Sequence, residues 1–137
     1  MDASVAMLWL VPQTNPVGVT YATSVLSALK GAPATVPSLW AVEMANVTAK
    51  VEAKGVVTEA QSQLFIALIG CLDVSTDPAT AAHALAEILN LARRYKISAY
   101  DATYLELALR MGLPLATLDK DLAKAAKKAG VPAFEPN

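Results

Sequence analysis

Short apolar runs alternate along the chain with longer segments in which apolar residues recur every three or four positions. The short runs predict strands and the longer segments predict helices. Proline, glycine and capping residues separate these segments, and 12–16 is expected to be a loop. The predicted helices cover 2–10, 15–31, 39–54, 58–69, 77–94, 98–112 and 119–130, and the predicted strands cover 34–36, 71–74, 113–118 and 131–134.

Polar residues at the helix starts support these boundaries. Asp, Ser and Thr side chains accept hydrogen bonds from the free N–H groups of a first helical turn. The expected capping residues are Asp2 or Ser4, Ser38, Thr58, Asp77, Ser98 and Asp119.

Strands that alternate with helices indicate an α/β fold in which helices cover a parallel sheet. Active sites of such sheets form at the carboxyl ends of the strands. Asp119 follows a predicted strand, Asp101 lies in the first turn of a helix, and Asp2 would follow a strand if one preceded it. Three acids are therefore expected at one rim of the sheet.

The composition indicates one packed domain over residues 1–137. Apolar residues make up 55% of the chain and charged residues 17%, which excludes a disordered protein. A mean hydropathy of +0.41 favours an apolar surface that an oligomer or partner covers. No apolar run approaches the ~20 residues of a membrane span, and no basic region that would mark a signal peptide precedes the run 5–11.

A single cysteine, Cys71, and a single histidine, His83, narrow the possible chemistry. No internal disulfide can form, so a cytoplasmic location is expected. A zinc site of the usual kind is nearly excluded, and a Ser–His–Asp or Cys–His site would have to use His83. The net charge is -1, but if four of the 12 acids hold metal, 11 basic groups face eight acids and could attract a polyanion.

Four acids are candidate metal ligands: Asp2, Glu43, Asp101 and Asp119. Carboxylate oxygens are the ligands that Mg²⁺ and Mn²⁺ prefer, and clustered carboxylates repel one another unless a cation is bound. Each acid also has a structural alternative. Asp2 and Asp119 could cap helices, Asp101 could belong to a capping box, and Glu43 could lie on a solvated face with Asn46 and Lys50.

Four segments that span nearly the whole chain carry a more specific signal: Asp2–Ala6 with Trp9 and Leu10, Pro37–Asn46, Ser98–Leu105 and Leu115–Leu122. In this order and at this spacing they resemble the PIN-domain ribonucleases, and specifically the VapC toxins of bacterial and archaeal toxin–antitoxin pairs. The resemblance implies an α/β/α sandwich with a central parallel sheet. It also implies Mg²⁺- or Mn²⁺-dependent cleavage of RNA, and a homodimer that a cognate antitoxin protein neutralises.

Carried over by position, the resemblance assigns Asp2, Glu43, Asp101 and Asp119 to the metal site and to catalysis. The neighbouring polar positions of the family, which would orient the ligands, are matched by Ser4, Asn46 and Thr117. Asp121 is either a fifth, outer acid or a helix-start residue, and the second alternative is slightly favoured.

One departure from the family concerns the start of the chain. The family usually has a short apolar strand before its first aspartate, whereas only Met1 precedes Asp2 here. The first strand is therefore expected to be missing, truncated or encoded upstream of Met1.

Three functions remain open at this stage. The favoured one is a metal-dependent endoribonuclease that acts as a toxin, and the main alternative is a degenerate PIN domain that binds RNA or protein without cleavage. A Mg²⁺-dependent phosphatase with Asp2 as nucleophile ranks lowest, because Ser4 stands where that class needs a second acid.

Overall fold

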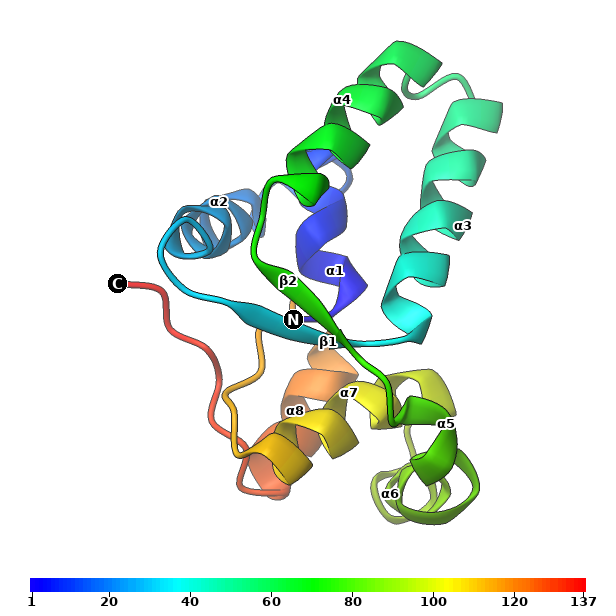
Figure 1. Ribbon diagram of the computed structural model, residues 1–137, viewed down its shortest axis with the longest axis vertical. Coiled ribbons are helices and arrows are strands. Elements are labelled where there is room, and N and C mark those ends of the chain that lie inside the picture. Colours follow the sequence, from blue (N-terminus) through cyan, green and yellow to red (C-terminus); the bar gives the residue numbers. More distant parts are fainter.

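Two short parallel strands pair in the computed structural model, which describes residues 1–137 (Figure 1). β1 (Ala34–Pro37) runs beside β2 (Val74–Asp77), with Ala34 opposite Val74 and Pro37 opposite Asp77. Between the two strands the chain forms α3 (Leu39–Ala53) and α4 (Glu59–Gly70). These two helices lie side by side and extend away from the sheet (Figure 1).

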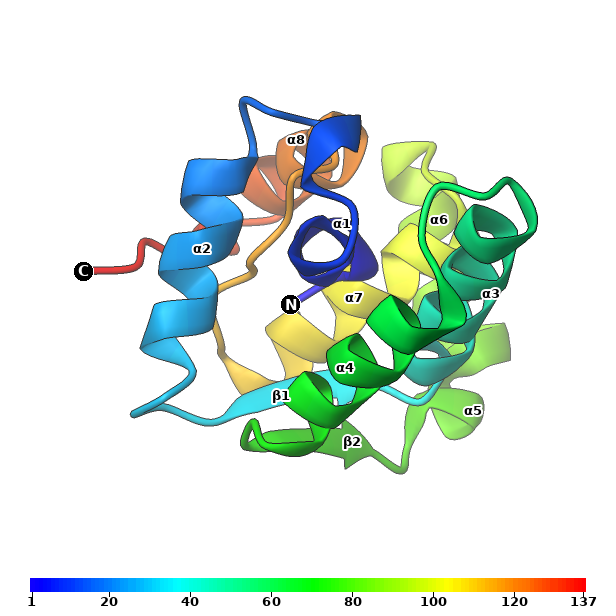
Figure 2. The ribbon, with the colours of Figure 1, turned by 90° about the horizontal axis from the view of Figure 1, so that it is seen from above.

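The other helices lie on both sides of the strands. They are α1 (Ala3–Ala6), η1 (Met7–Trp9), η2 (Pro12–Thr14), α2 (Val19–Ala28), α5 (Thr80–His83), the π-helical segment η3 (Ala84–Ile88), α6 (Leu89–Tyr95), α7 (Ala99–Met111) and α8 (Lys120–Lys128). In Figure 1, α1 and α2 lie on one side of β1, and α7 and α8 lie on the other. Figure 2, seen from above, shows the two strands at one edge of the molecule. The predicted α/β/α class with a parallel sheet is confirmed.

The core forms where α7 passes under the sheet. Residues 102 to 108 of this helix are all buried, so α7 is covered on every side. Leu105 of α7, Val5 of α1 and Leu122 of α8 have no exposed surface at all, and they belong to one buried cluster. None of the helices combines the length and the apolar character that a membrane crossing requires.

The sheet is smaller than the sequence predicts. Of the predicted strands, 34–36 is present within β1, but 113–118 and 131–134 meet only at one parallel bridge, between Leu115 and Ala133. The strand predicted over 71–74 overlaps β2 only at Val74. Cys71 is the C-cap residue of α4, and strand pairing starts at Val74.

Several helix starts also differ from the prediction. Asp77 ends β2 instead of capping a helix, and the predicted helix 77–94 begins at Thr80 and contains a π-helical segment. Neither Asp2 nor Ser38 makes a capping hydrogen bond. The predicted helix 15–31 is shortened to α2, because Asn15 turns back to accept a hydrogen bond from Gly18 N–H at 3.2 Å.

Three predicted caps are confirmed. Thr58 and Gln61 form a capping box at α4, Ser98 accepts from Asp101 N–H at the start of α7, and Asp119 accepts from Leu122 N–H at the start of α8. The last two caps matter for the site, because they fix the backbone at two of the candidate acids.

Candidate metal site

Asp2 is held by hydroxyl groups from two distant parts of the chain. Ser4 donates to Asp2 Oδ1 and Thr117 donates to Asp2 Oδ2, each at 2.6 Å. The backbone N–H of Asp2 donates to the carbonyl of Ala116 at 3.0 Å. The carboxylate is buried, at 5% exposure, and its orientation is therefore fixed from both sides.

The same two hydroxyls also join the start of the chain to the start of α8. Ser4 Oγ accepts from Leu118 N–H at 2.9 Å, and Thr117 Oγ1 accepts from Asp119 N–H at 3.0 Å. Asp2 and Asp119 are thus linked through one shared residue, Thr117. This contact places the predicted polar neighbours Ser4 and Thr117 where they orient acids.

Glu43 reaches the site from α3, where it is partly buried and accepts a hydrogen bond from the Tyr104 hydroxyl on α7. Burial raises the pKa of Glu43; the bond from Tyr104 opposes this rise, and the charges of Asp2 and Asp101 add to it. Burial and the adjacent Glu43 raise the pKa of Tyr104 far above its usual range, so the phenol stays protonated and remains a donor.

Asp101 lies in the first turn of α7, where its backbone N–H donates to Ser98 Oγ at 3.0 Å. Its pKa is raised, first by burial and next by the charge of Asp119, with smaller contributions from Asp2 and Asp121. Burial also raises the pKa of Asp2, against the hydrogen bonds from Ser4 and Thr117. The carboxylates therefore lie close enough to oppose one another's ionisation.

No side-chain cation pairs with these acids, and the Met1 ammonium acts on Asp2 only through its charge, which lowers the pKa of that acid. The ion pairs of the structure all lie in a different cluster, and none includes Asp2, Glu43, Asp101 or Asp119. No three or more His, Cys, Asp and Glu side chains are preassembled around a common point for a metal ion. The donor chemistry nevertheless fits a hard divalent cation, because the four acids offer only oxygen atoms and an excess of negative charge.

Comparison with known proteins agrees with this arrangement. The family profile of the PIN domain matches residues 1–128. The chain belongs to the PIN-domain family. PIN domains are generally nucleases, so the fold is of a nuclease type. A search of curated protein sequences found no match.

Two predicted neighbours of the ligands lie at the edge of this PIN-domain site. Asn46 is exposed on α3 and makes no hydrogen bond to the four acids. Asp121 is exposed in the first turn of α8, where it acts on Asp101 through its charge. The role of Asp121 as a helix-start residue agrees with its position. The side chain of Asn46 makes no hydrogen bond at this site.

Sequence reasoning assigned no role to Tyr104, which lies in the third segment of the PIN-domain resemblance. Its spacing of three from Asp101 puts both residues on one face of α7, and this spacing is the signal that could have identified it. Its hydroxyl meets Glu43 across 61 positions of sequence, a contact that no local pattern reports.

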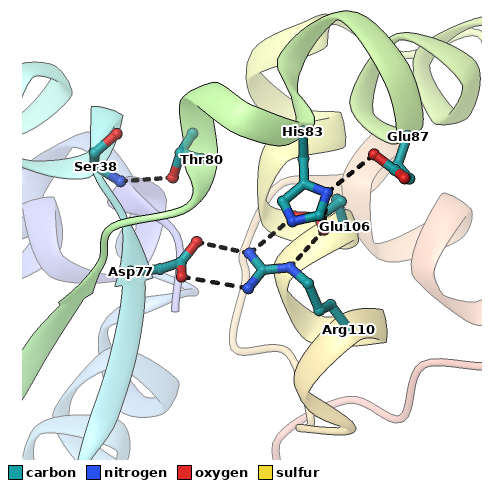
Figure 3. Close-up of polar contacts among 7 residues, drawn as sticks. All are labelled: Ser38, Asp77, Thr80, His83, Glu87, Glu106 and Arg110. Carbon is teal, nitrogen blue, oxygen red and sulfur yellow. Dashed lines mark hydrogen bonds and ion pairs between the residues drawn. The ribbon is translucent and has the colours of Figure 1, made fainter.

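A second polar cluster of the PIN domain was also missed (Figure 3). Arg110 donates to Asp77 Oδ2 at 2.6 Å and to Glu106 Oε1 at 2.7 Å, and His83 lies 2.9 Å from Glu87. The bonds to Arg110 lower the pKa of Asp77 and raise that of Arg110. Because its charges are mutually paired, this cluster ties the end of β2 to α7 and does not resemble the unpaired acids of the candidate site.

Proposed function

We propose that this PIN domain is a metal-dependent endoribonuclease whose ligands are Asp2, Glu43, Asp101 and Asp119. The observation that carries the proposal is their electrostatics: Asp2, Glu43 and Asp101 have raised pKa values, and none of the four acids forms an ion pair. Such an arrangement costs stability unless a cation binds. Mg²⁺ or Mn²⁺ is the proposed ion, because the ligands are carboxylates.

When bound, such an ion supplies an activated water and neutralises charge at the phosphate being cleaved. The chain's own residues supply the orientation. Ser4 and Thr117 hold both oxygens of Asp2, and Tyr104 holds one oxygen of Glu43. Ligands restrained in this way bind metal more tightly than mobile ones, because less freedom is lost on binding.

We further propose that the nuclease acts in the cytoplasm as the toxin of a toxin–antitoxin pair, as a homodimer that an antitoxin inhibits. Exposed apolar side chains support a partner surface: Val42 on α3 and Leu64 and Ile66 on α4 are each more than half exposed. A basic side chain from the antitoxin would pair with the unpaired acids and compete with the metal.

The alternative is a PIN domain that binds RNA or protein without cleaving RNA. One observation favours it, namely that no set of three or more ligands is preassembled for a metal. The two functions differ in whether RNA is cut when metal is supplied.

The test is cleavage of an end-labelled single-stranded RNA by the purified protein with Mn²⁺ and with chelator. Glu43→Gln removes one charge at constant size and should reduce cleavage by about 100-fold or more, because the role of the residue is electrostatic. Glu52→Gln on the same helix is the matched control and should cleave normally. Metal-independent cleavage, or equal cleavage by Glu43→Gln, would contradict the proposal, and binding without cleavage would support the alternative.

A further inference from the structure

One face of α8 carries a row of unpaired cations. All four side chains of this lysine stripe, Lys120, Lys124, Lys127 and Lys128, are exposed. Because an α-helix has 3.6 residues per turn, steps of three and four residues keep the four side chains on one face, over a length of about 12 Å. None of them lies within ion-pair distance of an acid. The stripe is therefore a band of free positive charge.

The opposite face of α8 fixes this helix to the core. Leu122, Ala125 and Ala126 are at most 5% exposed and belong to the main buried cluster. The start of the helix is held as well, since Asp119 Oδ1 accepts from Leu122 N–H at 2.8 Å. The lysine stripe is thus presented on an anchored helix, and a ligand that binds it does not have to order a loop first.

The stability of α8 does not explain the lysine stripe. Lys127 and Lys128 lie in the last turn, where the helix dipole favours a cation, but Lys120 is the first residue of the helix, where the dipole disfavours one. Lys124 lies four residues from both Lys120 and Lys128, and like charges at this spacing destabilise a helix. A bound anion would relieve both effects, so the arrangement favours a ligand with several negative charges.

The lysine stripe begins at the candidate metal site. Lys120 directly follows Asp119, whose backbone N–H donates to the same Thr117 hydroxyl that holds Asp2. A phosphate that approaches the unpaired acids is repelled by them, and cations beside the site would offset this repulsion. The helix leads away from the acids, so a ligand that lies along α8 reaches the acids with one end.

We propose that the lysine stripe binds the sugar–phosphate backbone of single-stranded RNA on one side of the phosphate that is cleaved. The inference rests on the proposed nuclease function and adds where the strand lies. About three phosphates fit along the stripe, one for each turn of α8. Contacts to phosphates carry no sequence information, so the stripe positions the strand and does not select its bases.

The test is binding of a labelled oligouridylate of about 12 nucleotides, longer than the stripe, measured by fluorescence anisotropy in chelator. Lys120→Gln with Lys124→Gln and Lys127→Gln should weaken binding by about 10-fold or more at low salt. Each lost phosphate contact contributes about 0.7 to the slope of log affinity against log salt, so this slope should become shallower by about 2. Gln forms helices about as well as Lys, and an unchanged melting temperature would show that α8 is intact.

A matched control removes three lysines elsewhere: Lys30→Gln, Lys50→Gln and Lys54→Gln. These residues are exposed and form no ion pair, and Figure 1 shows the end of α3 far from α8. The control has the same net charge as the stripe variant and should bind RNA as the parent does. Arginine at the three stripe positions should also preserve the affinity and the slope. Equal loss in the control, or no binding by the parent protein, would overturn the proposal.

Two further measurements distinguish the possible roles of the stripe. With Mn²⁺, the glutamine variant should raise KM for RNA by about 10-fold and leave kcat unchanged, because the stripe contacts the strand away from the reacting phosphate. A fall in kcat alone would overturn the proposal. Binding in chelator needs no cleavage, so binding through the stripe without cleavage with Mn²⁺ would refute the nuclease function and leave the stripe as an RNA-binding surface.

An octaglutamate peptide tests for an acidic protein as the ligand. It should compete less well than an unlabelled RNA of equal charge, because each glutamate loses side-chain freedom on binding, whereas RNA carries its charges on its backbone. Equal competition that is lost in the glutamine variant would assign the lysine stripe to an acidic protein and overturn the proposal.

Discussion

Thr117 donates a hydrogen bond of 2.6 Å to Asp2 although 115 positions separate them in the sequence. The same hydroxyl oxygen accepts from the backbone N–H of Asp119 at 3.0 Å. One side chain therefore sets the positions of two proposed ligands, and it does so without carrying a charge. This relationship makes Thr117 a test of orientation that is separate from the removal of a ligand.

Thr117→Val keeps the shape of the side chain and removes both hydrogen bonds. We expect metal affinity and metal-dependent cleavage to fall by about 10- to 100-fold, since Asp2 loses a donor and Asp119 loses a backbone tether. Stability should fall by only about 1 kcal/mol. Titration calorimetry with Mn²⁺ and the cleavage assay measure the two effects.

Thr48→Val is the control for this substitution. The Thr48 hydroxyl donates to the Met44 carbonyl within α3, so its loss leaves the four acids untouched. If both variants bind metal equally well, the hydroxyl of Thr117 has no orienting role.

The unpaired acids predict that metal stabilises the protein. A ligand that binds only the folded state adds about 2.7 kcal/mol at a concentration of 100 times its Kd. Asp101→Asn with Asp119→Asn should remove this shift and should raise the melting temperature of the metal-free protein, because repulsion is relieved. Asn also caps helices well, so the start of α8 should persist. A full response to Mg²⁺ in the double variant would place the metal elsewhere.

Stability should also depend on pH in a defined direction. Burial raises the pKa values of Asp2, Glu43 and Asp101, and the charges of neighbouring acids add to the rise at Glu43 and Asp101, so these acids bind protons more tightly in the folded state than in the unfolded state. In chelator, the free energy of unfolding should therefore rise as the pH falls from 7 towards about 5.

Asp77 has the opposite effect on the free energy of unfolding. Arg110 lowers its pKa, so its contribution is present above about pH 4 and is lost as the pH falls further.

Thermal unfolding between pH 7.5 and 3 measures this profile. Asp101→Asn should flatten the rise between neutral and mildly acidic pH and leave the acid loss in place. A parent protein whose stability falls steadily from pH 7 would contradict the raised pKa values.

The sequence predicted those features of the fold that depend on neighbours in the chain. The capping box at Thr58 and the caps at Ser98 and Asp119 are confirmed, since each needs only residues three positions apart. Asp77 was expected to be another cap, but its carboxylate binds Arg110 instead. The pairing of Asp77 with a side chain 33 positions away has no signature in the local pattern.

The candidate site also combines features that the sequence predicts with contacts between distant residues that it does not. The four acids were selected from the sequence through a family resemblance, and the structure adds the hydroxyl donors to Asp2 and Glu43 and the raised pKa values of Asp2, Glu43 and Asp101. The contact between Tyr104 and Glu43 could not be predicted, because only the folding of α7 against α3 brings the Tyr104 hydroxyl to Glu43. The strands 113–118 and 131–134 were overestimated, since an apolar run reports burial and not whether a neighbouring strand is available for pairing.

Tyr104→Phe removes the donor to Glu43 and keeps the ring in the core. The bond from Tyr104 lowers the pKa of Glu43, so its loss should raise that pKa. In a plot of cleavage rate against pH, the rise on the acid side should then move to higher pH. The rate on the alkaline plateau should change little. Tyr95→Phe is the control, because Tyr95 makes no hydrogen bond to an acid. Identical pH profiles for Tyr104→Phe and the parent would show that the phenol does not tune Glu43.

Arg110→Met tests whether the second polar cluster is structural. Arg110 is the only cation that contacts both Asp77 and Glu106, which are 7% and 4% exposed. Its removal leaves Asp77 without a partner and Glu106 with only His83, at 3.7 Å, so we expect a loss of about 3–5 kcal/mol in urea unfolding. Adding Asp77→Asn and Glu106→Gln to this variant should recover part of the loss, because amides are cheaper to bury than carboxylates.

The cleavage rate per folded molecule should stay at the parent value in both variants, since no residue of this cluster hydrogen-bonds to the four proposed ligands. A loss of cleavage that persists in the stabilised triple variant would assign the cluster a part in the reaction.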